Sequence, residues 1–360
     1  MKAARFDYVR RPDLTIIPQH ASAERPMIVN IHAHAVSERF LANLERQPIA
    51  GISAERGDMG TYFMRGGGWD RPSSIDVNLH DLPRRLESLR RRKVELQLFA
   101  PPPGFFSWAG GAAPREWVRA LHAQEIELAA QSEGLMEPMV VFPLGEPEHV
   151  TDEIRRAMDL YPFRAGMLPS TAGGRPLDDP IFEPMWSLIE ELGLLIFLHP
   201  TSAVDSERFG LYGVHVLVGW PFETTLAVTR LIFEGVLERH PDLKIILSHG
   251  GGNLVFLRGR LDSAYSAEGW EANPYYRKNI SRPPTAYLDR LYYDTCALSV
   301  ESNRFVVDTM GADRVMFGTD YPFDIGDPEG TRAVPMIESL PEPAREKIYR
   351  GNAYAALPPK

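Results

Sequence analysis

Short runs of aliphatic and β-branched residues alternate along the chain with longer segments in which apolar residues recur every three or four positions. The short runs predict eight strands, at residues 27–35, 94–100, 135–144, 163–169, 194–199, 243–249, 291–298 and 315–321. The longer segments predict amphipathic helices, among them residues 115–132, 148–160, 181–192, 224–239 and 301–310. Strands that alternate with helices form parallel βαβ units, so this α/β pattern predicts a (β/α)8 barrel of the TIM type. An open doubly wound sheet is disfavoured, because the eighth unit is present and the first strand lacks a Gly-rich phosphate turn.

Two segments interrupt this alternation. Residues 36–79 separate the first strand from the first helix, and residues 200–220 follow the fifth strand. Loops that leave the carboxyl ends of barrel strands lie over the active face. We therefore expect these long loops after strands 1 and 5 to border a functional site, with a mobile surface loop as the alternative for residues 36–60. The predicted organisation is an N-terminal arm over residues 1–26 and a single barrel domain over residues 27–357.

Composition narrows the class of protein. A chain of 360 residues with 44% apolar and 24% charged residues is typical of a soluble globular protein. The net charge of −9 argues against a general nucleic-acid or anionic-membrane binder. The one cysteine, Cys296, excludes an internal disulfide and fits a reducing compartment. Because no apolar run reaches the ~18 residues of a membrane span and residues 1–26 lack the core of a signal peptide, we expect a cytoplasmic location.

The first predicted strand carries two histidines, His32 and His34, in an otherwise apolar run. Side chains two positions apart on a strand project from the same face, so the two imidazoles are expected to lie side by side. Imidazole is the commonest side-chain ligand of transition metals. A lone buried histidine is more often a hydrogen-bonded core residue. The interpretation of this pair as metal ligands therefore depends on the residues that end later strands.

Three later strands also end in residues of this kind. The fifth ends at His199, the sixth at His249, and the eighth at Asp320. Polar groups at the carboxyl ends of barrel strands converge on one mouth. Together, His32, His34, His199 and Asp320 would supply three nitrogen ligands and one oxygen ligand with room for water. That composition is typical of a hydrolytic or lyase metal centre.

Several motifs give the chain a family resemblance. They are the His-x-His pair, Leu-His-Pro at 198–200, Ser-His-Gly-Gly-Gly at 248–252, Gly-Thr-Asp-Tyr-Pro-Phe at 318–323 and Gly-Asn-Ala at 351–353. From about residue 27 to residue 357 the chain resembles the amidohydrolase superfamily. More narrowly, it is similar to the branch of aminocarboxymuconate-semialdehyde decarboxylase and related metal-dependent, non-oxidative decarboxylases.

The resemblance implies a division of roles. His32, His34, His199 and Asp320 would bind one divalent metal, zinc in the nearest members and manganese in some. His249 would be the catalytic acid/base beside it, with Asp320 as the second catalytic residue. A metal lowers the pKa of bound water toward ~7, where an imidazole can move its proton. The three glycines after His249 let the backbone turn closely behind it.

The implied reaction is the non-oxidative decarboxylation of an unsaturated or aromatic carboxylic acid, a carbon–carbon lyase activity. Proton delivery to the carbon that bears the carboxylate would break conjugation and release carbon dioxide. A hydrolase or hydratase of a related lactone, amide or unsaturated acid is an alternative, because it needs the same metal and base. A non-catalytic metal-binding or ligand-binding barrel is a third hypothesis.

Four further residues are candidates for substrate contacts. By the resemblance, Arg71 in the loop after the first strand and Arg260 in a Gly-Arg motif after the sixth would clamp the carboxylate, since arginine binds carboxylates with a bidentate fork. Arg260 would reach the site of a neighbouring subunit, which predicts a homodimer. A surface ion pair is the alternative for each arginine. His215 and Trp220, after the fifth strand, are expected either to touch substrate or to anchor the loop.

The chain departs from the named decarboxylase at some positions. Thr201 and Ser202 stand where Trp-Asp is usual, and Asn30 stands where an aspartate often precedes His-x-His. Since the metal and acid/base residues are retained while pocket positions change, we expect the same chemistry on a different acid. Asp294, near the end of the seventh strand, is expected to be a strand-end hydrogen-bond acceptor, with support of a metal ligand as the alternative.

Overall fold

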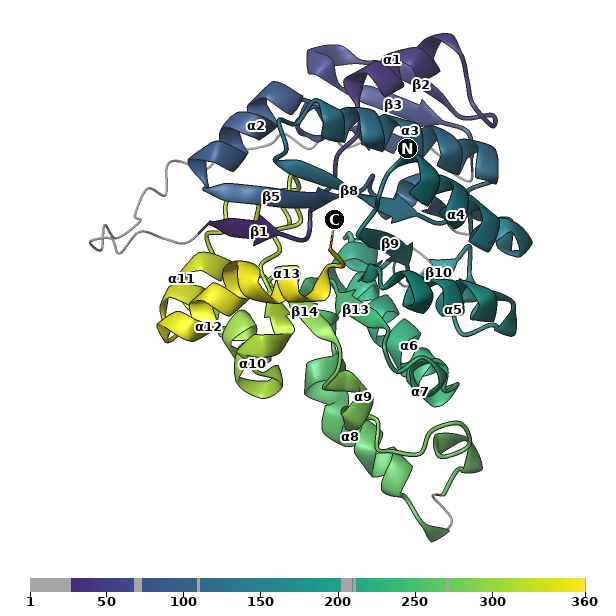
Figure 1. The fold of residues 1–360 in the computed structure, drawn as a ribbon, viewed down its shortest axis with the longest axis vertical. Coiled ribbons are helices and arrows are strands. Elements are labelled where there is room, and N and C mark those ends of the chain that lie inside the picture. Colours follow the sequence, from purple (N-terminus) through teal and green to yellow (C-terminus); the bar gives the residue numbers. More distant parts are fainter. Residues whose placement is uncertain are drawn as a thin grey trace.

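A sheet of eight parallel strands lies at the centre of the protein (Figure 1). The computed structural model describes residues 27–67, 73–108, 111–201, 209, 212–269 and 272–359. In sheet order the strands are β1 (Ile28–Asn30), β5 (Val94–Phe99), β8 (Met136–Val141), β9 (Ala165–Pro169), β12 (Leu195–His199), β13 (Lys244–Leu247), β14 (Tyr292–Asp294) and β15 (Val315–Met316). Each strand pairs in parallel with the next. The predicted (β/α)8 architecture is confirmed.

The barrel closes just beyond the ends of its first and last strands. Ala33 and Tyr321 form a parallel bridge. The amide of Ile31 donates to the carbonyl of Phe317 at 3.0 Å, and the amide of Asp320 donates to the carbonyl of His32 at 3.0 Å. The backbone that completes the barrel is therefore the same backbone that carries two of the predicted metal ligands.

Helices surround the sheet, as the 3.6-residue periodicity predicts. They are α2 (Leu82–Arg91), α3 (Arg115–Ala130), α4 (Val150–Leu160), α5 (Glu183–Leu192), α6 (Trp220–Phe233), α7 (Val236–Arg239), α8 (Leu254–Ser266), α9 (Thr285–Leu288), α10 (Val300–Met310), α11 (Ala333–Glu338), α12 (Glu342–Glu346) and α13 (Asn352–Ala356). The expected helix over 224–239 is divided into α6 and α7, because Gly235 adopts a left-handed φ of 77°.

The period-two alternation of the strands positions the functional face. On β12, Leu195 and Phe197 belong to one apolar cluster, whereas Ile196 and Leu198 belong to another, so alternate side chains face opposite sides of the strand. His199 continues the first set by two residues, so its imidazole lies on the inner side at the carboxyl end of the strand.

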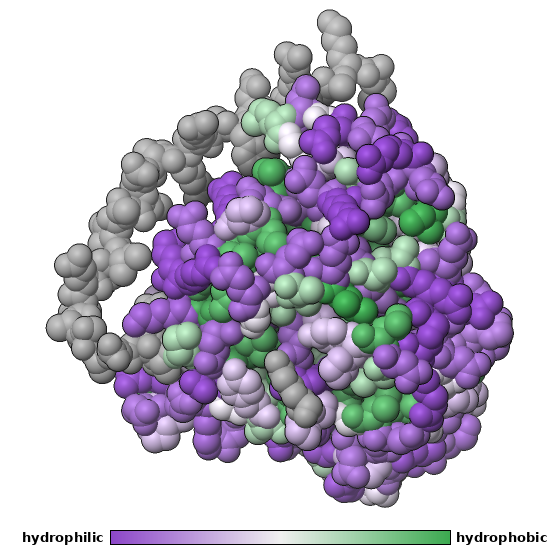
Figure 2. Space-filling model, turned by 45° about the horizontal axis from the view of Figure 1, so that its top comes forward, coloured by the Kyte–Doolittle hydropathy of each residue, from purple (hydrophilic) through white to green (hydrophobic). Residues whose placement is uncertain are grey.

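Over the face shown in Figure 2, polar side chains predominate and apolar patches are small and separate.

Residues 36–79 do not form the long irregular loop that the sequence suggested. They contain α1 (Glu38–Arg46) and an antiparallel sheet of β2 (Ser53–Arg56), β3 (Tyr62–Arg65) and β4 (Ser73–Ile75), which lies beside α3 (Figure 1). On β3, Tyr62 and Met64 are fully buried while Phe63 and Arg65 face outward. This alternation is the strand signal that the interpretation as a loop overlooked.

The segment after β12 is described in part, at residues 201, 209 and 212–220. A π-helix over His215–Gly219 runs into α6, and the combined helix His215–Phe233 is long and apolar enough, by length and composition only, to cross a membrane. Close to half of it is buried inside the protein, and it includes the buried Glu223. We interpret it as an outer helix of the barrel.

Glu125 on α3 is a buried acid outside the barrel. Both of its carboxylate oxygens are buried without a hydrogen-bond partner among the described residues. Burial raises the pKa of this carboxyl well above its usual 4.5. A buried group of this kind is protonated in the folded protein at pH values where the unfolded chain has lost the proton.

The substitution Glu125→Gln is therefore expected to raise the free energy of unfolding, by an amount that grows with pH. Above pH 4.5 the folded state binds more protons than the unfolded state, so wild-type stability falls by up to about 1.4 kcal/mol per pH unit until the folded carboxyl ionises. Thermal unfolding near pH 5 and near pH 7 measures the difference, with the exposed Glu116→Gln on the same helix as control. An equal gain at both pH values would contradict this account.

Candidate metal centre

Three histidines and one aspartate meet at the carboxyl ends of the strands. His32 and His34 follow β1, His199 ends β12 and Asp320 follows β15. All four are buried, and one ligand atom from each lies within 4.8 Å of the others. Asp320 Oδ1 is 3.2 Å from His32 Nε2 and 3.1 Å from His34 Nε2. Metal–ligand bonds of about 2.0–2.1 Å in a tetrahedral centre separate the ligand atoms by about 3.3 Å, so this spacing suits one shared ion.

The two N-terminal histidines lie just beyond the strand on which the sequence placed them. β1 ends at Asn30, and His34 forms an isolated bridge with Ala100 of the neighbouring segment. The Asn30 carboxamide accepts from the His32 amide at 3.2 Å and donates to the Thr319 hydroxyl at 2.8 Å. These bonds tie the segment to the one that carries Asp320, and both imidazoles still face the same site.

Hydrogen bonds at Nδ1 leave Nε2 of two imidazoles, those of His32 and His199, to face the site. His32 Nδ1 donates to Asp294 Oδ2 at 2.7 Å, and His199 Nδ1 donates to the Pro200 carbonyl at 2.9 Å. Their Nε2 atoms, like Asp320 Oδ1, are buried without a hydrogen-bond partner within the described ranges. Since buried polar atoms are rarely left unpaired, these three atoms fit a bound divalent cation. The structure therefore contains a site with the chemistry of a divalent metal centre.

The protonation states of the centre follow from burial and charge. Burial lowers the pKa of His34 and holds that of His199 well below its usual value, so both are neutral. Burial would also lower the pKa of His32, but the Asp320 and Asp294 carboxylates outweigh it and raise the pKa to about 9. Although burial favours protonated Asp320, the positive charge of His32 holds the pKa of this carboxyl well below its usual value. Metal uptake at neutral pH would thus release a proton from His32.

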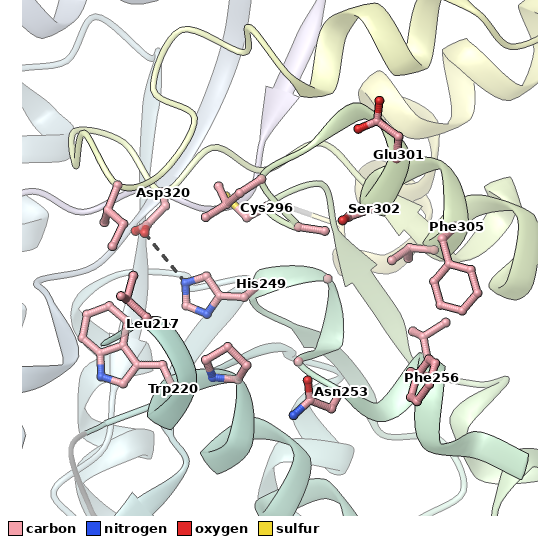
Figure 3. Close-up of a pocket in the computed structure, with 18 of the residues that line it drawn as sticks. Leu217, Trp220, His249, Asn253, Phe256, Cys296, Glu301, Ser302, Phe305 and Asp320 are labelled. Carbon is pink, nitrogen blue, oxygen red and sulfur yellow. Dashed lines mark ion pairs between the residues drawn. The ribbon is translucent and has the colours of Figure 1, made fainter. Parts of the chain in front are cut away.

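His249 stands beside these four residues at the edge of a cavity (Figure 3). Its Nε2 is 3.8 Å from Asp320 Oδ2, and 11% of its side chain is exposed. Both residues adopt left-handed φ angles, 54° for His249 and 57° for Asp320, a conformation that costs a non-glycine residue free energy. At Gly252, a Cβ atom would lie 2.3 Å from the Pro221 carbonyl oxygen, so the turn behind His249 requires glycine there.

Asp294, at the end of β14, hydrogen-bonds both to the ligand His32 and to the backbone turn that follows His249. Its Oδ2 accepts from His32 Nδ1, while its Oδ1 accepts from the amides of Gly250 at 2.7 Å and Cys296 at 3.0 Å. The expected strand-end acceptor is therefore also the group that orients His32 and the turn after His249. Its place at a strand end, beside the ligand-bearing strands, is the signal that pointed to this role.

His32, Asp294 and Cys296 form a second group whose ligand atoms lie within 4.8 Å of one another. Both oxygens of Asp294 are already hydrogen-bonded. Burial raises the pKa of the Cys296 thiol well above its usual value, so the thiol is protonated. This group is consequently a poorer cation site than the one that contains Asp320.

Replacing Asp294 with asparagine is expected to weaken metal binding by about 10- to 100-fold, because the carboxylate that orients a ligating imidazole also raises its basicity. Competition with a chromophoric chelator measures the dissociation constant. Asp178→Asn removes a buried carboxylate that pairs with Arg230 at 2.8 Å, away from the cavity, and serves as the control. Equal affinities for the two variants would show that Asp294 has only a backbone role.

Of the four residues predicted to contact substrate, the structure places one at the cavity. Trp220, the first residue of α6, lines the cavity and stacks on His249 with ring centroids 6.1 Å apart and planes 17° apart. His215 lies on the π-helix and Arg260 is exposed on α8, and neither is among the described residues that line the cavity. Arg71 lies outside the described residues.

Comparison with known proteins shows that the chain is similar to proteins named as decarboxylases. The amidohydrolase family model matches residues 29–358. The chain is 30% identical over 285 residues to 2-amino-3-carboxymuconate-6-semialdehyde decarboxylase of Dictyostelium discoideum, covering 79% of this chain and 78% of the relative. It is 29% identical to gamma-resorcylate decarboxylase of a Rhizobium species, over 59% of this chain and 66% of that protein.

Solved structures show the same fold. The structure of 5-carboxyvanillate decarboxylase from Sphingomonas paucimobilis aligns with a TM-score of 0.73 at 21% identity, over 92% of this chain and 98% of that one. A dihydroxybenzoic acid decarboxylase from a Polaromonas species, solved with manganese and an inhibitor, aligns with a TM-score of 0.68 at 19% identity, over 92% and 96% of the two chains.

Proposed function

The chain belongs to the amidohydrolase family and is a carboxy-lyase, and we propose that it decarboxylates an aromatic or unsaturated carboxylic acid without an oxidant. The observation that carries this proposal is the donor set of three buried imidazoles and one carboxylate that converges beside His249 at an open cavity. The similar proteins from Dictyostelium discoideum and Rhizobium are both decarboxylases. We propose a different acid from theirs because the chain departs from the decarboxylase pattern at Asn30 and Thr201, although neither is among the described residues that line the cavity.

We infer that His32, His34, His199 and Asp320 hold one divalent ion, with zinc favoured and manganese as the second choice. Imidazole nitrogen and carboxylate oxygen at these separations suit zinc. Manganese is present in the solved Polaromonas structure. When bound, the ion supplies Lewis-acid polarisation of oxygen atoms and neutralises negative charge.

The proton that decarboxylation requires is assigned to His249. An imidazole gives and takes a proton near neutral pH, and Asp320 lies 3.8 Å from its Nε2, so the protonated form has a counter-charge. Transfer of this proton to the carbon that bears the carboxylate breaks conjugation. The carbon–carbon bond then breaks, carbon dioxide leaves, and the bonding electrons return to the π system. His249 recovers a proton through the open side of the cavity.

Trp220 is assigned a positioning role. Its indole stacks on the His249 ring and lies 6.1 Å from the His199 ring. An aromatic face against the His249 ring restricts rotation of the imidazole and excludes water from it. The indole Nε1 is buried without a hydrogen-bond partner among the described residues.

We further propose a cytoplasmic homodimer in which Arg260 of one copy and Arg71 of the other clamp the substrate carboxylate. Arg260 is exposed on α8, which projects from the barrel together with α9 (Figure 1). Phe222 and Leu226, four residues apart on α6, are exposed apolar side chains that a second copy could cover. Sedimentation analysis tests the dimer, and a rise in KM for Arg260→Ala would support the shared site.

A screen for carbon dioxide release tests the activity. Metal-loaded enzyme is incubated with hydroxybenzoates, carboxylated phenols and muconate-type acids, and the products are identified by NMR. The proposal predicts loss of the carboxyl group with one proton in its place. Hydrolysis of a lactone or amide, or hydration of a double bond, without carbon dioxide release from any acid would instead assign a hydrolase or hydratase.

A further inference from the structure

The cavity beside His249 continues well beyond the reaction centre. Its volume is about 570 Å³, roughly the share of nineteen water molecules at about 30 Å³ each in the liquid. Figure 3 shows Trp220 and Asp320 on one side of His249, and Phe256 and Phe305 on the other. A single-ring acid with its carboxylate near Asp320 leaves the second side unfilled.

Two phenylalanines from different helices form this second side. Phe256 comes from the first turn of α8 and Phe305 from the middle of α10, and both lie on the cavity wall. Phe256 is 81% exposed and Phe305 is 47% exposed, so the chain leaves two aromatic rings uncovered at this place. Val306 and Leu298 add apolar wall, and Leu298 is held at a left-handed φ of 63°. Exposed aromatic rings that line a cavity are typical of ligand contacts.

The charge of the second side limits what it can bind. Among the described residues that line the cavity there is no lysine or arginine. Glu301, next to Ser302 at the start of α10, is its one carboxylate apart from Asp320, and no ion pair involves Glu301 within the described ranges. Since the Glu301 carboxylate has no cationic partner among the described residues, it repels a nearby anion and accepts hydrogen bonds from hydroxyl or amino groups.

From this geometry we propose that the region bounded by Phe256, Phe305 and Glu301, here called the distal subsite, binds a largely apolar substituent of the substrate that carries no negative charge. The inference rests on the proposed decarboxylase function and narrows its substrate class. The substrate is a monocarboxylic aromatic or unsaturated acid whose carboxyl group lies toward Asp320. Its extended substituent reaches the two phenylalanines and ends in an apolar group or a hydrogen-bond donor, not in a second carboxylate.

Two matched series of ligands test the proposal. The first consists of 2,6-dihydroxybenzoate and its derivatives with a methyl, butyl or phenyl group opposite the carboxylate, together with a derivative whose butyl chain ends in a carboxylate. The second consists of the corresponding resorcinols, which lack the carboxyl group. Carbon dioxide release gives kcat/KM for the acids, and calorimetry gives dissociation constants for the resorcinols, so binding is measured without turnover.

We expect kcat/KM and resorcinol affinity each to rise at least tenfold from the methyl to the phenyl derivative, and to fall for the carboxylate-ended chain. Phe256→Ala and Phe305→Ala should each remove most of the gain, and Glu301→Gln should relieve the discrimination against the carboxylate. Phe63→Ala, an exposed phenylalanine of β3 outside the cavity, should keep wild-type selectivity. Circular dichroism verifies that the variants fold.

The outcomes separate this inference from the proposed function. If no acid releases carbon dioxide but the resorcinols show the expected preference, the function fails and the distal subsite stands. If the acids are decarboxylated without preference for the substituent, the distal subsite is disproved and the function stands. A change from dimer to monomer in Phe256→Ala with unchanged selectivity would also disprove it, because the ring would then be covered by a second copy.

Discussion

Replacing His249 with asparagine is expected to lower kcat by about 10³-fold, within the range of general acid–base contributions, while the metal content stays that of the wild type. His249 is the imidazole at the cavity that is not one of the four clustered ligands. Its removal therefore deletes the proton donor and leaves the donor set intact. Asparagine is the preferred replacement, because it tolerates the left-handed backbone that His249 adopts at φ 54°.

Single-turnover measurements of carbon dioxide release, together with elemental analysis, examine this prediction. His149→Asn, which changes a half-exposed histidine paired with Glu148, is the control and should leave kcat unchanged. A kcat within threefold of the wild-type value would show that His249 is not the proton donor.

Asp320→Asn is expected to have a larger effect, because Asp320 faces three imidazoles at once. Its Oδ1 lies within 3.2 Å of His32 and His34, and its Oδ2 lies 3.8 Å from His249. The substitution removes the one anionic ligand of the donor set and the counter-charge of the proton donor. We expect loss of most bound metal and a fall in kcat/KM of about 10⁴-fold or more.

The left-handed φ of 57° at Asp320 makes asparagine the appropriate replacement here too. Asp324→Asn, an exposed aspartate in the same loop, controls for the loss of one negative charge. Elemental analysis and kcat/KM are measured on the same preparations. Full metal occupancy with wild-type activity in Asp320→Asn would contradict the assigned donor set.

Much of the fold was predictable because local patterns determine it. Aliphatic runs such as 194–199 and 243–249 are buried on both faces, which is the pattern of parallel strands covered by helices. Gly235 shows the limit of periodicity, since the pattern continues from α6 into α7 across a break in the backbone. The insertion over 36–79 was missed because its short antiparallel strands alternate over only a few residues, which weakens the signal.

The candidate metal centre was predictable for a topological reason. Carboxyl ends of parallel barrel strands meet at one mouth, so strand-end residues as distant in sequence as His32 and Asp320 could be placed together from the order of the strands alone. Contacts to the substrate outside the metal centre were harder to predict, because they depend on how loops and outer helices orient their side chains. Among the described residues, His215 and Arg260 do not line the cavity of their own chain, whereas Phe256 does and was not singled out from the sequence.

The measurement that tests the central claim most directly is the metal content of the purified wild type and of His199→Ala, determined by elemental analysis beside a decarboxylation assay. His122→Ala, which removes a buried histidine bonded to the Val141 carbonyl on the outer side of the barrel, is the matched control. We predict close to one zinc or manganese per chain in the wild type and in the control, and little in His199→Ala. Wild-type protein that contains no divalent metal and takes up none on reconstitution would contradict the account.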